Sequence, residues 1–272
     1  MIRRFGAWPA WLFMAMFLAA PLLALVPEAV TGGGAAFANI WRDRQFLIAL
    51  RNTLALGAVS GLLSAVVGTL IAMELARLPP RHRQWMMSLL GLPLAFSGLV
   101  VAYGFILAFG RAGFVTQLLG MAGADPSIIG SWIYSVGGLA FAYAYYLIPR
   151  VALALYPVFA NFDNTPLLAA RTLGATPWEA FRDTVVPEVG PSVLSSAFFV
   201  SAVAMGTYGT ALALVGTQLN ILPLMLLSKV GDGGTDFAAA AAMSLILMFV
   251  CILVLGVGDA FTSRRINRQA GR

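Results

Sequence analysis

The stretch NFDNTPLLAARTLGATPWEAFRDTVVPEVGPS, residues 161–192, has the clearest local pattern in the chain. Asn164 or Thr165 can cap a helix whose first residue is Pro166, because proline lacks the N–H that a helix start leaves without an acceptor. We expect this helix to end at Gly174, since glycine readily adopts the left-handed conformation that closes many helices. The pattern therefore predicts a short helix followed by a tight bend.

A second helix is predicted directly after that bend. Thr176 can cap it, Pro177 suits its first turn, and Glu179 stands three places after the cap, which is the spacing of a capping box. We expect Pro187 to end it, because proline interrupts the interior of a helix. The stretch thus reads as two capped helices that meet at Gly174.

The surface around the bend combines small residues with large apolar ones. The small residues are Ala169, Ala170, Gly174 and Ala175, and the large ones are Leu168, Leu173 and Phe181. Such a surface lets a partner's backbone approach closely while the larger groups fill a groove. An amphipathic segment lying on the membrane is the alternative, and Arg171 and Arg182 would suit it. The local pattern leaves both interpretations open.

The rest of the chain has the composition of a membrane protein. Of its 272 residues 60% are hydrophobic and only 10% are charged, whereas a water-soluble protein needs more polar surface. A helix needs about 20 mostly apolar residues to cross the hydrocarbon core. Six stretches approach this length: 11–26, 53–73, 86–109, 132–155, 191–217 and 237–261. We therefore expect an all-α membrane protein with six transmembrane helices.

The first of these stretches has two interpretations. It is the shortest and follows Arg3 and Arg4, as the apolar part of a secretory signal peptide would. Because five further spans follow, we expect it to be retained as a span.

The basic residues predict how the spans are oriented. Twelve of the seventeen lysine and arginine residues fall on one side of the predicted spans and five on the other, where the five are Arg42, Arg44, Arg51, Arg111 and Lys229. Cytoplasmic flanks carry the excess of such residues. With six spans, both termini and the segment 156–190 are then cytoplasmic, and the loops 27–52, 110–131 and 218–236 face outward.

The sequence lacks the residues that several classes of function require. Lys229 is the only lysine and no GxxxxGK[ST] precedes it, so we expect no ATP hydrolysis by this chain. The only histidine, His82, lies among arginines, which disfavours an intramembrane peptidase. The only cysteine, Cys251, lies in an apolar run and is expected to pack in the core. We predict no catalytic residue, no cofactor, no metal site and no nucleic-acid binding.

A self-contained secondary transporter or a channel remains the alternative function. Ion-driven transporters carry ionisable residues near the middle of the membrane. Here Glu74 lies near a helix end three residues before Arg77, with which we expect a local pair, and Asp259 is expected at an interface. This scarcity of charge disfavours coupling to protons or sodium.

The fifth span contains a candidate for the translocation path. The glycines of the sequence MGTYGT, residues 205–210, loosen the helix where Thr207, Tyr208 and Thr210 can present hydroxyl groups to a cavity. Close packing through small residues is the alternative. Other spans offer tyrosines for the same path: Tyr143, Tyr145 and Tyr146 on the fourth, and Tyr103 on the third. An interfacial or packing role is the favoured alternative for these tyrosines.

The stretch at 161–192 resembles the EAA loop of ABC importer permeases. That loop has the pattern Glu-Ala-Ala, three residues, Gly, nine residues, Ile-x-Leu-Pro. The matching residues are Ala169, Ala170, Gly174 and Pro187, whereas Leu168, Thr184 and Val186 replace the glutamate, isoleucine and leucine. The sequence RNTLALGAVSGLLSAVVGTLIAMELAR, residues 51–77, is similar to the first core helix of this family, and the likeness covers roughly residues 51–261.

The resemblance implies a fold, partners and a cargo class. The fold is that of a type I ABC importer permease: a first span and outward loop at 1–50, a five-span core at 51–261 and a basic cytoplasmic tail at 262–272. The partners are ABC ATPase subunits that receive the loop 156–190 as a coupling helix, a second permease, an extracytoplasmic solute-binding protein and lipid of the bacterial inner membrane. The cargo is a small solute such as a polyamine, an aminoalkyl phosphonate or thiamine.

One departure from the family pattern concerns that cargo. Permeases for oxyanions, thiamine and polyamines often have Gly-Glu-Phe-Gly where this chain has Gly206, Thr207, Tyr208 and Gly209. The missing carboxylate leaves less reason to expect a cationic cargo.

Overall fold

The computed structural model describes residues 8–31, 34–123, 125–216, 219–231 and 236–270, and all regular elements in these ranges are helices. Six helical segments are long and apolar enough to span a membrane, which confirms the predicted number of spans. They are Trp11–Val30, Arg44–Arg77, Gly98–Met121, Val136–Ala160, Pro177–Gly206 and Phe237–Phe261. The chain is therefore an all-α, multi-pass membrane protein.

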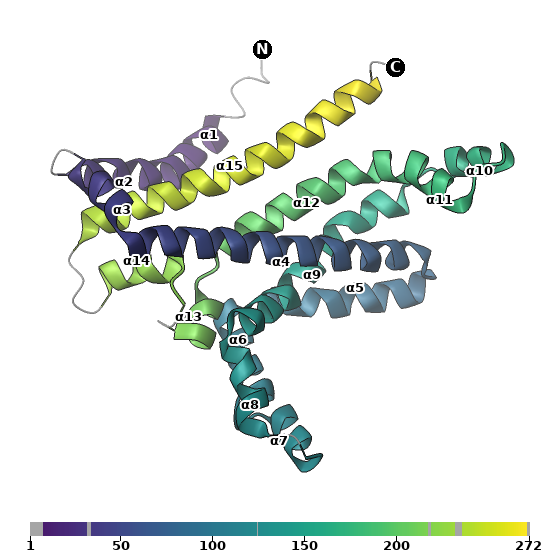
Figure 1. Cartoon of the computed structure of the whole chain (residues 1–272). Helices are drawn as coiled ribbons and strands as arrows, with labels where there is room; N and C mark the ends of the chain where they lie inside the picture. The colour runs from purple at the N-terminus through teal and green to yellow at the C-terminus, as the bar shows by residue number, and fades with distance from the viewer. Residues whose placement is uncertain (1–7, 32–33, 124, 217–218, 232–235, 271–272) are drawn as a thin grey trace. The chain divides into compact units, whose positions relative to one another are not determined.

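The elements follow the chain in a simple order (Figure 1). The first half contains α1 (Trp8–Met14), the π-helical turn η1 (Ala15–Ala19), α2 (Ala20–Val30), α3 (Ala35–Arg42), α4 (Arg44–Arg77), α5 (Pro80–Ala95), α6 (Gly98–Phe109), α7 (Phe114–Met121), α8 (Pro126–Ser131) and the 3₁₀ turn η2 (Trp132–Tyr134). The second half contains α9 (Val136–Ala160), α10 (Thr165–Thr172), α11 (Pro177–Ala180), the π-helical turn η3 (Phe181–Val185), α12 (Val186–Gly206), α13 (Gly209–Val215), α14 (Leu222–Val230) and α15 (Phe237–Ala270).

The chain forms two compact units, and α4 and α15 contribute residues to both. The first unit consists of Met1–Asn52 and Asn220–Val250. Its core is a cluster of buried residues from α2, α3, α4, α14 and α15: Ala29, Ile40, Phe46, Ala49, Leu222, Ala239, Ala241, Ala242 and Met243. The Asn52 side chain donates a hydrogen bond of 2.9 Å to the Asn220 carbonyl, which joins the two segments of this unit.

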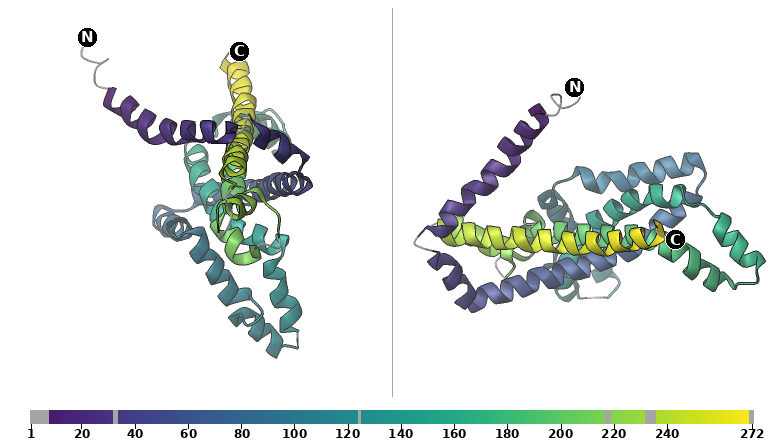
Figure 2. Two further views of the ribbon diagram at one scale, coloured as in Figure 1. Left: turned by 90° about the vertical axis from the view of Figure 1, so that its left-hand side faces the viewer. Right: turned by 90° about the horizontal axis from the view of Figure 1, so that it is seen from above.

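The second unit consists of Thr53–Leu219 and Cys251–Arg272 and contains the candidate site. The most deeply buried span, α9, packs against both α5 and α12. Within this unit α6, α7 and α8 lead away from α5 and α9, whereas α10 and α11 extend past the end of α9 (Figures 1 and 2).

The longest helices, α4 and α15, run for 34 residues each without a proline. At 1.5 Å per residue such a helix is about 50 Å long, so it exceeds a hydrocarbon core of about 30 Å. Their ends can therefore reach beyond the membrane on one or both sides.

The third predicted span differs from the structure. The stretch 86–109 is not one helix, because α5 ends at Ala95 and α6 begins at Gly98. The Ser97 hydroxyl accepts a hydrogen bond from the Val100 N–H and so starts a new helix. Pro93 lies in the last turn of α5, where a proline weakens helix continuity.

The fifth span begins earlier than predicted. The prediction that Pro187 ends a helix was wrong, since helical structure continues from Pro177 through η3 and α12 to Gly206. Pro187 stands in the first turn of α12, directly after the π-helical turn, where it is tolerated. The second helix of the loop is thus the beginning of the fifth span.

Candidate functional site

The first helix of the loop, α10, begins at Thr165, one residue before the predicted Pro166, with Asn164 at the N-cap position. Neither Asn164 nor Thr165 caps it through its side chain; instead, the Asp163 carboxylate accepts hydrogen bonds from the Thr165 N–H at 2.9 Å and the Thr165 hydroxyl at 2.7 Å. These bonds, the hydroxyl first, hold the pKa of Asp163 below its usual value. An aspartate two residues before the helix was the signal for this turn.

Gly174 ends α10 in the predicted left-handed conformation, with φ of 91°. The Ala175 N–H donates to the Ala170 carbonyl and the Gly174 N–H donates to the Arg171 carbonyl, at 3.1 and 3.2 Å. This is the Schellman pattern, which satisfies carbonyl groups that a helix end leaves free. A side chain at 174 would meet no atom within 4 Å, so only the backbone conformation selects glycine here.

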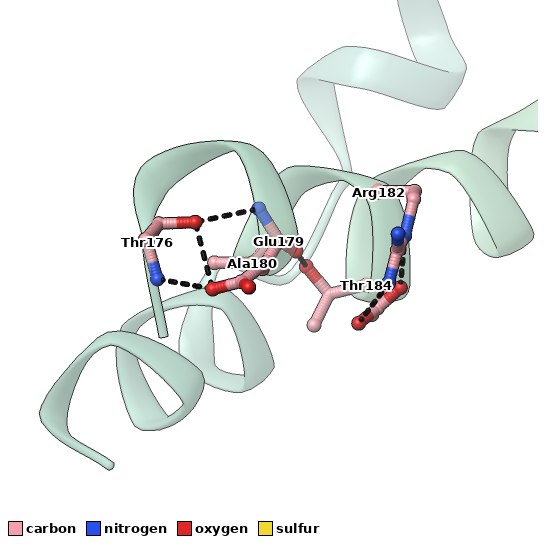
Figure 3. A network of polar contacts seen from close by, with 6 residues as sticks. Thr176, Glu179, Ala180, Arg182 and Thr184 are labelled. Carbon is pink, nitrogen blue, oxygen red and sulfur yellow. Dashed lines mark hydrogen bonds and ion pairs between the residues drawn. The ribbon is translucent and has the colours of Figure 1, made fainter. Parts of the chain in front are cut away.

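The capping box of α11 is confirmed (Figure 3). The Thr176 N–H donates to the Glu179 carboxylate at 2.8 Å, and the Glu179 N–H donates to the Thr176 hydroxyl at 3.3 Å. One turn later the Thr184 hydroxyl donates to the Ala180 carbonyl, and Arg182 pairs with Asp183. Bonds between neighbouring residues thus hold the backbone on both sides of the bend.

Large apolar side chains around the bend are uncovered within this chain. Leu173 is 88% exposed and Leu168 is 58% exposed. Trp178, which the sequence analysis missed, is 67% exposed, and its ring stacks on Phe181. Of the other predicted coupling residues, Ala169 and Gly174 are exposed, whereas Ala170, Ala175, Phe181 and Pro187 are half-buried. We name Leu168, Leu173, Gly174 and Trp178 the apical surface.

The fifth span breaks where the sequence predicted. Helix α12 ends at Gly206 and α13 begins at Gly209. Helix α13 packs along α6, and the Thr210 hydroxyl donates a hydrogen bond of 3.0 Å to the Gly98 carbonyl. The Tyr143 hydroxyl of α9 donates to the Thr207 carbonyl at 2.8 Å. The α5–α6 and α12–α13 breaks are thus joined to each other, and the second is anchored to α9.

The predicted path residues fall into two groups. Tyr143 and Thr210 are fully buried and hydrogen-bonded, so they face no open space in this conformation, and the Thr207 hydroxyl bonds to the Val203 carbonyl of its own helix. Tyr208 and Tyr103 are exposed, at 38% and 56%. Sequence spacing could not separate the groups, because burial depends on how α6, α9 and α13 pack.

Two further tyrosines were predicted to line the same path. The Tyr146 hydroxyl is buried beside Thr207 and Thr210 but lacks a hydrogen bond of good geometry. Tyr145 is exposed and lines an apolar groove along α6 of about 320 Å³. Of the five tyrosines proposed for the path, Tyr103, Tyr145 and Tyr208 are exposed in this chain, whereas Tyr143 and Tyr146 are buried.

Glycines bring α4 against α12 and α9. A Cβ atom at Gly61 would overlap the Ser201 side chain and lie 3.1 Å from the Ala197 carbonyl oxygen of α12. At Gly68 it would lie 2.7 Å from the Val151 Cβ of α9. Close approach through small residues is the usual way in which membrane helices pack. The helix that leads from the apical surface is therefore held firmly in the bundle.

Two smaller predictions concern Glu74 and Cys251. Glu74 and Arg77 form the expected local pair, at 2.9 Å. Cys251 is half-buried, and its thiol lies 3.9 Å from the Ala202 carbonyl of α12. An apolar groove of about 470 Å³ runs between α4 and α12, and Phe181 lies at its loop end. In the described part of the chain no three histidine, cysteine or acidic side chains gather as metal ligands would.

Comparison with known proteins identifies the family. The profile of the family described as "Binding-protein-dependent transport system inner membrane component" matches residues 64–267. The sulfate transport system permease protein CysW of Synechocystis is 30% identical over 249 residues, which are 90% of this chain and 88% of that protein. The chloroplastic sulfate permease 2 of Chlamydomonas reinhardtii is 30% identical over 236 residues; the match covers 86% of this chain and 62% of the algal protein.

A solved structure supports the fold. A chain of a bacterial alginate ABC transporter, crystallised in complex with a periplasmic protein that binds an alginate pentasaccharide, superposes with a TM-score of 0.78. The match covers 97% of this chain and 94% of that chain at 17% identity, so it supports the fold assignment only. With six apolar spans and a family match over most of its length, this chain belongs to the binding-protein-dependent transport system inner membrane components and is a multi-pass permease subunit of an ABC importer.

Proposed function

We propose that this chain forms half of a translocation pathway and receives its driving force from a separate ABC ATPase at the apical surface. The observation that carries the proposal is the continuity of the helix that leads away from that surface. From Pro177 the chain is helical through η3 and α12 to Gly206, where the break at 207–208 follows. A displacement at the loop is thereby passed along the axis of α12 to the junction of α6, α9 and α13.

The apical surface has the properties of a docking site for another protein. Its large apolar groups are exposed on a bend whose backbone is held by its own caps, so little ordering would be needed on binding. Leu168 stands where the family pattern has an acidic residue, which favours an apolar contact at that point. The other predicted coupling residues, Ala169, Ala170, Ala175, Phe181 and Pro187, shape or support this surface.

The remaining partners follow from the requirements of transport. Alternating access needs two halves that move against each other, so a second permease, identical or homologous, completes the pathway. The proposal also includes a pair of ATPase subunits and an extracytoplasmic solute-binding protein. With the loop facing the ATPase, both termini are cytoplasmic, residues 51–261 form the permease core, and 262–272 form a basic tail.

For the cargo we propose a small oxyanion of the sulfate type. Two relatives at 30% identity are named as sulfate permeases, and the chain has Thr207 and Tyr208 where related permeases carry a carboxylate. The exposed residues Tyr208 and Tyr103 can offer hydroxyl groups to such an anion, whereas Tyr143 and Thr210 would hold the helix breaks in place.

Uptake by cells tests the cargo. Deleting the gene should lower the initial uptake of radiolabelled sulfate in sulfate-limited cells, and a plasmid copy should restore it. The uptake of radiolabelled spermidine should stay unchanged. Unchanged sulfate uptake with reduced spermidine uptake would reject the oxyanion and favour a polyamine, without affecting the family assignment.

A further inference from the structure

The π-helical turn η3 joins the apical surface to α12. In η3, Phe181–Val185, the hydrogen bonds span five residues, and the Val186 N–H donates to the Phe181 carbonyl. Pro187 follows immediately. Proline has no N–H to donate, and in a regular α-helix its ring would clash with the carbonyl four residues earlier, that of Asp183. The change from five-residue to four-residue hydrogen bonding therefore falls at a residue that has no N–H to donate.

The same arrangement occurs at the start of the chain. The turn η1, Ala15–Ala19, closes with the Ala20 N–H donating to the Ala15 carbonyl, and Pro21 follows. Both π-helical turns of the described residues thus precede a proline by the same spacing. Other prolines, at 93, 149, 157 and 191, lie within α-helices without such a turn. At η3 the Thr184 hydroxyl also occupies the Ala180 carbonyl, which a regular helix would offer to the Thr184 N–H.

The π-helical turn changes which side chains face the bundle. A π-helical turn holds about one residue more than an α-turn, so the segment before it is rotated by about 100° relative to a continuous α-helix. Val189 and Val185, four residues apart, are buried, and the next buried residue is Ala180, five residues earlier. In a continuous α-helix, positions 181 and 178 would lie on the same buried face as Val185 and Val189, in place of Ala180. Trp178 would then turn toward the bundle, whereas it is 67% exposed.

We propose that Pro187 is a positioning residue for energy coupling: it maintains the π-helical turn, which sets the rotational phase that points Trp178 and Leu173 outward. This inference rests on the proposed docking of an ATPase at the apical surface. Pro187 itself is half-buried and acts through the geometry of the helix rather than by contact with the partner.

The first measurement is structural and needs no partner. Spin labels are placed at Leu173 and Phe199, two exposed positions on either side of η3, in a Cys251→Ser background of the full chain. Pro187→Ala should shift the distance distribution measured by pulsed EPR, because a regular α-helix replaces the π-helical turn. Pro191→Ala, a matched proline one turn along the same helix, should leave the distribution unchanged. Removal of a proline from a helix raises helix propensity, so folding is preserved.

The second measurement is functional and includes a rescue. The amount of ATPase subunit retained during purification from native cells should fall at least about tenfold in Pro187→Ala, as for the loss of a tryptophan hot spot. Deleting the exposed Asp183 in the Pro187→Ala chain removes one residue from the turn, so the phase, the EPR distances and ATPase retention should all return. A merely structural proline would not be rescued by a deletion.

The outcomes separate this inference from the proposed function. If the wild-type and Pro191→Ala chains retain ATPase and Pro187→Ala does so equally, the phase proposal is overturned. A failure of the deletion to restore retention overturns it as well. If the wild-type chain retains no ATPase, the proposed coupling function fails first, whereas the EPR comparison still decides whether Pro187 sets the phase.

Discussion

Replacing Gly174 by valine is expected to remove most ATP-driven uptake while the chain remains folded and inserted. The residue has φ of 91°, in the left-handed region that a β-branched side chain avoids. The left-handed conformation costs a residue with a Cβ atom about 1–2 kcal/mol, which lowers the population of the native bend by roughly 5- to 30-fold. Initial uptake of radiolabelled sulfate should fall by a similar factor, with unchanged protein in the membrane fraction.

Gly123→Val is the matched control for this experiment. Gly123 has nearly the same φ, 97°, and a Cβ atom there also meets nothing within 4 Å. It lies between α7 and α8, far along the chain from the loop. We expect Gly123→Val to have the same free-energy cost for its left-handed backbone conformation but no loss of uptake. Equal losses in both variants would mean that the effect of Gly174→Val is general destabilisation rather than uncoupling.

Gly61→Leu is expected to disrupt the packing of the second unit. A Cβ atom at 61 would overlap the Ser201 side chain, and the nearby Ala197 carbonyl belongs to the α12 backbone, which cannot move without displacing the helix. Overpacking of this kind costs about 1–3 kcal/mol or more. The chain should lose thermal stability in detergent, seen as a lower midpoint for loss of the monodisperse peak in size-exclusion chromatography.

Gly91→Leu provides the comparison for the packing variant. Gly91 lies in α5, and a Cβ atom there would meet nothing within 4 Å. Because leucine favours a helix by up to about 1 kcal/mol over glycine, this variant should be as stable as the wild-type chain or slightly more stable. A Gly61→Leu chain as stable as Gly91→Leu would contradict the close α4–α12 packing.

Features governed by neighbouring residues could be predicted from the sequence. The left-handed Gly174 and the capping box of Thr176 and Glu179 were predicted correctly, because each depends on a few adjacent groups. The number of spans followed from hydropathy for the same reason. At α10, Asn164 stands at the predicted N-cap position, but the side-chain hydrogen bond comes from Asp163 beside it.

Features that depend on the packing of helices could not be predicted from the sequence. Pro187 was expected to end a helix, yet the π-helical turn before it lets helical structure continue into α12. The hydroxyl groups around the fifth-span break were predicted as a possible path, but Tyr143 and Thr210 are buried and bonded to backbone carbonyls of α12–α13 and α6. Only the arrangement of α6, α9 and α13 decides which of these groups are accessible.

The central claim is that a separate ATPase contacts this chain at the apical surface. A photo-crosslinking amino acid at Leu173, which is 88% exposed, tests it directly, with Met121, the last residue of α7 and 87% exposed, as the control. Illumination of cells should attach position 173, and not position 121, to a protein that mass spectrometry identifies by its GxxxxGK[ST] sequence, with a yield that changes when ATP is depleted. An ATPase adduct at 121, or none at 173 in cells that carry out uptake, would contradict the account.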